Sequence, residues 1–201
     1  MEKPADNQYP IHDLLRQRWS PRAFDDRPIE TEKLRSLFEA ARWAPSSNNG
    51  QPWRFLVAMK ENKTEYDRLF NCLVEANQTW AHRAPVLILS VAKLDFEDGS
   101  TNRHAFHDTG MAAENLVIQA TALGLVTHQM AGFHIDQARA NCRIPDGYEP
   151  VAMMAVGYPG DPVLLPDRLR AREVQPRVRK PFTEFVYSAT WGQPASLLGK
   201  E

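Results

Sequence analysis

Apolar side chains recur every three to four residues in several segments of the chain, which is the spacing of one helix face. The longest such segment, residues 103–123, is apolar around most of its circumference and is followed by Gly124, a residue that helix C-termini favour. We expect it to form a central, buried helix of about 30 Å. Its expected core face carries Phe106, Ala113, Val117, Ala120 and Leu123. Shorter helices are expected at residues 11–18, 31–43 (with Thr31 as N-cap), 65–75 and 135–141.

Short apolar runs between turn residues predict the strands. Residues 85–92 (PVLILSVA) and 151–158 (VAMMAVGY) are apolar almost throughout, as buried strands are. Shorter strands are expected at residues 53–58, 125–130 and 184–187. Because helices separate these strands without a regular βαβ alternation, the pattern favours an α+β fold over a doubly wound α/β fold.

The tail beyond Asp161 is rich in proline and arginine and has no obvious partner within its own compact unit. An extended arm of this kind commonly packs on another subunit, so we predict a homodimer. The 201 residues contain no internal repeat or low-complexity segment. We therefore expect a single domain that spans residues 1–201.

Composition narrows the class of protein. Apolar residues make up 43% and charged residues 24%, which are ordinary globular values. The net charge of -1 argues against a dedicated nucleic-acid binder, which is usually basic overall. The polar N-terminus does not resemble a signal peptide, and the longest apolar run is far shorter than the ~20 residues that cross a bilayer. We expect a cytoplasmic protein with neither nucleic acid nor membrane as its partner.

Metal and thiol chemistry have little support from the spacing of ligand residues. Cys72 and Cys142 form no CxxC or CxxH pair, so we expect two reduced thiols. His104, His107 and Asp108 share one helix face, but without an HExxH motif the pattern favours capping or solvent-facing roles, and no metal site is predicted. GxSxG, GxxxxGK[ST] and GxGxxG motifs are absent, which removes the main support for hydrolase, P-loop and Rossmann chemistry.

Positively charged residues are concentrated in two short segments of the chain. Residues 16–22 (RQRWSPR) contain three arginines and a serine, and residues 167–180 contain six cations against two acids. Arginine and serine are suited to phosphate oxygens, although a solvated basic helix end and a solvated basic tail are simpler explanations of each segment. The tail could also bind nucleic acid or acidic groups of a partner subunit. If the fold brings the two segments together, they provide what one phosphate monoester requires.

A third polar segment lies between the second expected helix and the first expected strand. Residues 45–51 (PSSNNGQ) hold two hydroxyls and three carboxamides directly before an aromatic strand start. Such a loop offers donors and acceptors to a polar heterocycle. An ordinary helix-to-strand connection would use the same turn-forming residue types, so both interpretations stay open.

Taken together, these segments resemble the FMN-dependent nitroreductase family. The matches follow the family order from about residue 10 to residue 190, nearly the whole chain. They comprise residues 18–24 (RWSPRAF), 44–55 (APSSNNGQPWRF), 108–116 (DTGMAAENL), 122–125 (ALGL), 131–133 (AGF), 156–159 (VGYP), 177–181 (RVRKP) and 184–186 (EFV).

The resemblance implies a homodimeric α+β flavoprotein with a mixed β-sheet, flanking helices, a long central helix and a C-terminal arm that extends onto the partner subunit. Two FMN molecules would lie at the subunit interface. The implied phosphate ligands are Arg18, Ser20, Arg177 and Arg179, and Arg22 would lie beside the pyrimidine edge of the flavin. The other implied contacts are Trp19, the loop residues Pro45, Ser46, Ser47, Asn49 and Gln51 (partly from the other subunit), Asn77, and the backbone of Met130, Ala131 and Gly132 near the flavin N5.

The implied activity is that of an NAD(P)H-dependent FMN oxidoreductase that reduces nitroaromatic, quinone or similar conjugated acceptors by a ping-pong mechanism. Because the cofactor carries the hydride chemistry, no catalytic side-chain acid or base is expected. Trp19 and Trp80 stand where relatives often have polar or basic residues, and the short segment after Trp80 indicates a reduced substrate lid. A reductase specific for a small aldehyde or enone, or a flavin-binding protein without turnover, remains the alternative.

Overall fold

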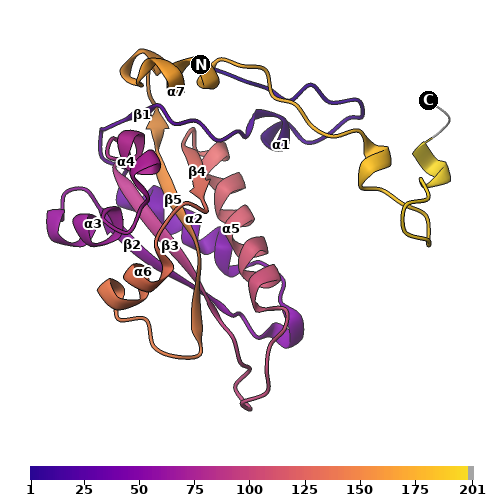
Figure 1. The fold of residues 1–201 in the computed structure, drawn as a ribbon, viewed down its shortest axis with the longest axis horizontal. Helices are drawn as coiled ribbons and strands as arrows, with labels where there is room; N and C mark the ends of the chain where they lie inside the picture. Colours follow the sequence, from indigo (N-terminus) through magenta and orange to yellow (C-terminus); the bar gives the residue numbers. More distant parts are fainter. Residues whose placement is uncertain (199–201) are drawn as a thin grey trace.

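The computed structural model describes residues 1–198 and centres on a five-stranded sheet (Figure 1). The strands are β1 (Phe24–Asp25), β2 (Trp53–Met59), β3 (Val86–Lys93), β4 (Val126–Met130) and β5 (Tyr148–Pro159). The strand order is β1-β5-β3-β2, and β4 also pairs with β5. The pairings within residues 1–198 are all antiparallel, so the mixed strand directions implied by the resemblance do not occur there. Between β2 and β3, for example, the chain returns to the same end of the sheet, so Met59 at the end of β2 lies opposite Val86 at the start of β3.

Side chains of β3 alternate between two cores, one on each face of the sheet. Leu87 and Leu89 enter the first core, and Val86 and Ile88 enter the second. Helices α3 (Lys63–Phe70), α4 (Glu75–Ala81) and α6 (Ile135–Cys142) cover the first core, whereas α2 (Thr31–Arg42) and α5 (Ala105–Ala122) cover the second (Figure 1). The result is a three-layer α+β architecture, as the sequence predicts.

The expected helix at residues 65–75 corresponds to α3, which already ends at Phe70, and α4, which begins at Glu75, was not predicted. The chain breaks between them because the backbone there bonds to a distant segment. Leu73 forms an isolated bridge with Phe133, and the Val74 N–H donates to the carbonyl oxygen of Gly132 at 3.1 Å. The prediction of one helix was therefore wrong for a tertiary reason.

Two details of the longer helices also differ from expectation. Glu30, rather than Thr31, occupies the N-cap of α2, and its side chain makes no capping hydrogen bond. Phe106 is 49% exposed, so it is not part of the core face of α5. It lies in the first turn, where the buried positions are Ala105, Asp108 and Thr109.

The tail differs most from the sequence prediction. The expected strand at residues 184–187 is absent from the described part of the chain: Phe182–Glu184 form a 3-10 turn, and Tyr187 makes only an isolated bridge with Pro194. The helix α7 (Asp167–Glu173) and the two-residue β1 were not predicted. Strand β1 depends on pairing with the distant end of β5, where Phe24 lies opposite Pro159.

The N-terminal segment, which includes α1 (Asp13–Gln17), and the C-terminal arm run side by side away from the sheet (Figure 1). The ring of Tyr9 lies 5.5 Å from that of Phe182. Further along the arm, Val178 and Trp191 are 80% and 88% exposed. The arm thus presents large apolar side chains that its own chain does not cover.

Candidate active site

Arginines from both ends of the chain meet beside the C-terminus of α1. Arg18 occupies the C-cap of α1 and donates from Nη1 to Ser20 Oγ at 3.2 Å. Burial, followed by the charges of Arg18 and Arg179, lowers the pKa of Arg177. Within residues 1–198 these three guanidinium groups form no salt bridge with a carboxylate. Burial raises the pKa of the Glu114 carboxyl and the charge of nearby Arg18 acts in the opposite direction, but Glu114 forms no salt bridge with the cluster in the described chain. Guanidinium groups that are not paired with a carboxylate are suited to binding an anion.

The orientation of Arg177 leaves it free to bind a ligand. Its Nη1 donates to the carbonyl oxygens of Lys3 at 2.8 Å and Arg16 at 3.0 Å. These bonds fix the guanidinium while the Nη2 and Nε donors stay available. The neighbouring Arg179 is exposed and bonds only to the carbonyl oxygen of Val178. The predicted set Arg18, Ser20, Arg177 and Arg179 is therefore brought together by the two terminal segments.

Arg22 lies next to this arginine cluster and is tied to α7. Glu173 Oε1 accepts hydrogen bonds from the backbone N–H groups of Arg22 and Ala23 at 2.6 and 3.0 Å. Burial lowers the pKa of Arg22 most strongly, Arg172 lowers it further, and Glu173 acts in the opposite direction. The sequence singled out Arg22 but gave no signal for Glu173 beyond its place in the charge balance.

A half-buried histidine contacts the segment that precedes Arg22. His128, on β4, lies 2.9 Å through Nδ1 from the carbonyl oxygen of Pro21, and its ring centroid lies 4.6 Å from that of Trp80. Burial, reinforced by the charge of Arg22, lowers the pKa of His128 to about 4. The ring is therefore neutral near pH 7, and its Nδ1 carries the hydrogen because a carbonyl can only accept. Trp19 is half-buried beside the cluster, 4.8 Å from Lys3 Nζ.

The polar loop of residues 45–51 takes an unusual backbone path at the other end of the molecule. Asn48, Asn49 and Gln51 have positive φ values of 50°, 53° and 44°. Two hydrogen bonds hold the loop: the Ser47 N–H donates to Asp108 Oδ2 at 2.9 Å, and the Gln51 N–H donates to Ser46 Oγ at 3.1 Å. Positive φ is uncommon outside glycine and recurs at ligand-binding sites, and among the other residue types asparagine adopts it most readily.

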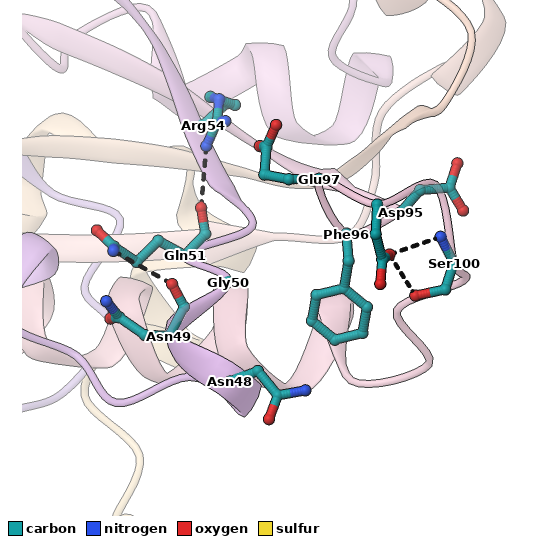
Figure 2. A pocket seen from close by; sticks show the side chains of 10 residues that line it. Asn48, Asn49, Gly50, Gln51, Arg54, Asp95, Phe96, Glu97 and Ser100 are labelled. Atoms are coloured by element: carbon teal, nitrogen blue, oxygen red, sulfur yellow. Dashed lines mark hydrogen bonds between the residues drawn. The ribbon is translucent and has the colours of Figure 1, made fainter.

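The same loop borders a pocket of about 640 Å³. Figure 2 shows the amide side chains of Asn49 and Gln51 on one side of this pocket and Phe96 on the other. Phe96 packs against Gly50, where an added Cβ would lie 3.0 Å from its Cε1. Pro45 precedes the pocket and is exposed. The amides at the pocket are thus exposed and available to a ligand.

The predicted residues Asn77 and Gly132 meet on the α4 side of the sheet. Asn77 Nδ2 donates to the carbonyl oxygen of Gly132 at 3.0 Å. A Cβ at position 132 would lie 2.7 Å from Asn77 Nδ2, so this approach depends on glycine. Met130 is buried at the end of β4, and Ala131 is exposed.

One chain does not bring the arginine cluster and the amide loop together. Arg18 shares a second pocket, of about 230 Å³, with Thr121 and Gly124 at the C-terminal end of α5. Ser47 is bound to Asp108 in the first turn of the same helix. At ~1.5 Å per residue, Asp108 and Thr121 lie about 20 Å apart along the axis. Within one chain, the arginine cluster and the amide loop therefore lie at opposite ends of α5.

The described residues contain no group of three His, Cys, Asp or Glu side chains that could hold a metal ion. Asp108 instead accepts from the Ser47 N–H and lies 3.1 Å from His107 Nδ1, so its oxygens are already engaged. No helix among residues 1–198 is both long and apolar enough to span a bilayer.

The fold and site define an α+β protein in which both chain ends contribute to an arginine cluster, and comparisons with known proteins identify its family. The model of the Nitroreductase family matches residues 15–158. The "Uncharacterized 15.4 kDa protein in ask 5'region" of Mycolicibacterium smegmatis is 33% identical over 147 residues, which cover 70% of this chain and 99% of that relative. A protein of Polynucleobacter asymbioticus, provisionally named NADH dehydrogenase/NAD(P)H nitroreductase, is 24% identical over 184 residues, 82% of this chain and 92% of that relative.

A solved structure described as an oxidoreductase containing FMN superimposes with a TM-score of 0.86 and 37% identity, covering 92% of this chain and 95% of the other. The chain therefore belongs to the nitroreductase family and is an oxidoreductase. The predicted family and the predicted α+β fold are both confirmed.

Proposed function

We propose that this protein binds FMN and transfers electrons from NAD(P)H to nitroaromatic, quinone or similarly conjugated acceptors by a ping-pong mechanism. The observation that carries the proposal is the cluster of Arg18, Arg177 and Arg179, whose charges have no carboxylate partner within residues 1–198. Segments from both ends of the chain build it, and a phosphate monoester is the ligand it suits. Family membership and the FMN-containing structural neighbour support the same cofactor.

The donors present fit each part of FMN. Arg18, Ser20, Arg177 and Arg179 would hold the phosphate. Arg22 would face the pyrimidine edge, and the amides of Asn49 and Gln51 would contact the ring from a second copy of the chain. On the opposite side, Asn77 and the backbone of residues 130–132 would line the ring. The exposed apolar arm would extend onto that second copy, which makes the functional unit a homodimer.

When bound, FMN supplies the hydride and electron chemistry. The residues of this chain then bind and orient the reactants. The fixed charge of Arg22 stabilises negative charge that develops beside it, and because the guanidinium is preorganised this costs no reorganisation during the reaction. Arg177 is held by two carbonyl oxygens through Nη1, so its other nitrogen atoms can donate to the phosphate. No side-chain acid or base is required.

An absorption spectrum of the purified protein, followed by anaerobic addition of NADH or NADPH, tests the proposal. We expect a yellow protein, or uptake of added FMN, and rapid bleaching by the reductant. A colourless protein that takes up no FMN refutes it, and a bound flavin that neither reductant bleaches leaves only a flavin-binding role. Steady-state rates with nitrofurazone, menadione and small enals then separate a broad reductase from one specific for enones.

Co-expressed variants test whether each site is shared between two copies. Arg18→Ala damages the arginine cluster, and the double variant Asn49→Ala/Gln51→Ala damages the loop. In a mixed dimer, one site combines both defects and the other is intact. With random assembly about half of the dimers are mixed, so co-expression should restore FMN binding at about a quarter of all sites, whereas sites within single chains would show no restoration.

A further inference from the structure

Glu173 is a buried carboxylate that makes hydrogen bonds outside its own helix. It ends α7 and is 1% exposed. Its Oε1 accepts from two successive backbone N–H groups, those of Arg22 and Ala23, at 2.6 and 3.0 Å. These contacts join parts of the chain that are 150 residues apart. Glu173 therefore fixes the backbone from which Arg22 projects.

The second oxygen of the same carboxylate is not satisfied. Glu173 Oε2 is buried without a hydrogen-bond partner in the described structure, and it lies 3.9 Å from Arg22 Nη1. That distance is too long for a hydrogen bond but short for two opposite charges in a site with little water. A buried acid kept only for stability would normally have both oxygens bonded. The unpaired oxygen instead faces the guanidinium that is expected to lie beside the cofactor.

The other charges around Glu173 are cationic. Lys3 Nζ donates to the backbone oxygen of Glu173 at 2.6 Å. Arg172 also acts on Arg22, where it lowers the pKa, while Glu173 raises it. Glu173 is thus the acid that offsets the positive charge of Arg22.

We propose that Glu173 is a positioning residue: it anchors Arg22 at the FMN site and sets how much of the Arg22 charge acts on the bound flavin. The inference rests on the proposed function and extends it to a residue on α7. Glu173 acts in two separable ways. Its oxygen lone pairs hold the backbone of residues 22–23, and its negative charge offsets the guanidinium.

Two substitutions separate these roles. Glu173→Gln keeps a side-chain oxygen for the two N–H groups but removes the charge. With Arg22 less compensated, reduced flavin is stabilised, and the midpoint potential of bound FMN should rise while FMN affinity falls little. Glu173→Ala removes the anchor as well, and FMN affinity should fall about tenfold, the effect of losing roughly one hydrogen bond. Asp167→Asn is the matched control, because Asp167 is an exposed acid on the same helix.

Potentiometric titration of the FMN-bound proteins and fluorescence titration of the FMN-free proteins measure these effects. The rise in potential for Glu173→Gln should disappear when Arg22→Ala is also present, because the two residues act together. An unchanged potential in Glu173→Gln, or the same rise without Arg22, overturns the inference even if wild type binds FMN. A wild type that takes up no FMN overturns the proposed function and this inference together. If Glu173→Ala does not fold, the Glu173→Gln potential decides alone.

Discussion

His128 makes the stability of this fold sensitive to acid. The ring is half-buried and packs against Trp80, and its Nδ1–H donates to the Pro21 carbonyl oxygen. Burial lowers its pKa to about 4 in the folded protein. In an unfolded chain the pKa of histidine is about 6.5. As the pH falls, the unfolded chain therefore binds a proton first.

The sign and size of the effect follow from this difference. Above pH ~6.5 neither state is protonated at His128, and the full stability is present. Between pH ~6.5 and pH ~4 only the unfolded state gains the proton, so stability falls as the pH decreases. A difference of about 2.5 in pKa corresponds to about 3 kcal/mol. This is a large share of the ~5–15 kcal/mol by which domains are stable.

Urea unfolding of the FMN-free protein at fixed protomer concentration, from pH 4 to pH 8, measures the effect. His128→Asn places an amide donor near the Pro21 oxygen but does not titrate. Wild type should lose about 3 kcal/mol more than this variant between pH 7 and pH 4, because carboxylate titrations are common to both. His82→Asn, at an exposed position, should retain the wild-type pH dependence. Parallel curves for wild type and His128→Asn would refute the reasoning.

Three further predictions concern the site and the core. Arg18→Ala and Arg179→Ala should each weaken FMN binding about tenfold or more, since each removes a charge-assisted contact. Fluorescence titration measures the affinity, with Arg168→Ala, at an exposed position, as the control. Unchanged affinity in both variants contradicts the phosphate assignment. Gly160→Ala should destabilise by about 1–3 kcal/mol or more, because its Cβ would lie 2.4 Å from the Phe24 carbonyl carbon. Leu116→Ala, in the second core, should cost about 2–5 kcal/mol in urea unfolding, and exposed Phe106→Ala much less.

The elements that the sequence predicts well are those whose signal is local. Strands β3 and β5 are almost continuously apolar because both faces of the sheet are covered, and α5 is marked by its apolar circumference and by Gly124. The break between α3 and α4 has no such local signal. It follows from the bond between the Val74 N–H and Gly132, which becomes visible only once the chain is folded.

The site shows the same division. The residue types of the basic segments and the amide loop indicate ligand binding, and the family resemblance supplies their roles. The residues that hold them in place carry no recognisable motif. Asp108 falls in a histidine-containing face that suggested capping, and His128 stands at an unremarkable spacing. Their importance comes from burial and from single backbone contacts, neither of which a sequence pattern encodes.

The net charge of the chain does not reveal how its charged residues are distributed. Of the two acids in residues 167–180, Asp167 pairs with Arg170 at the surface, while Glu173 turns inward to Arg22. Neither forms a salt bridge with Arg177 or Arg179 in the described chain. An overall balance of -1 is therefore compatible with a local arginine cluster that forms no salt bridge among the described residues. Because such a cluster repels itself, its assembly from two chain ends is best explained by an anionic ligand that binds there.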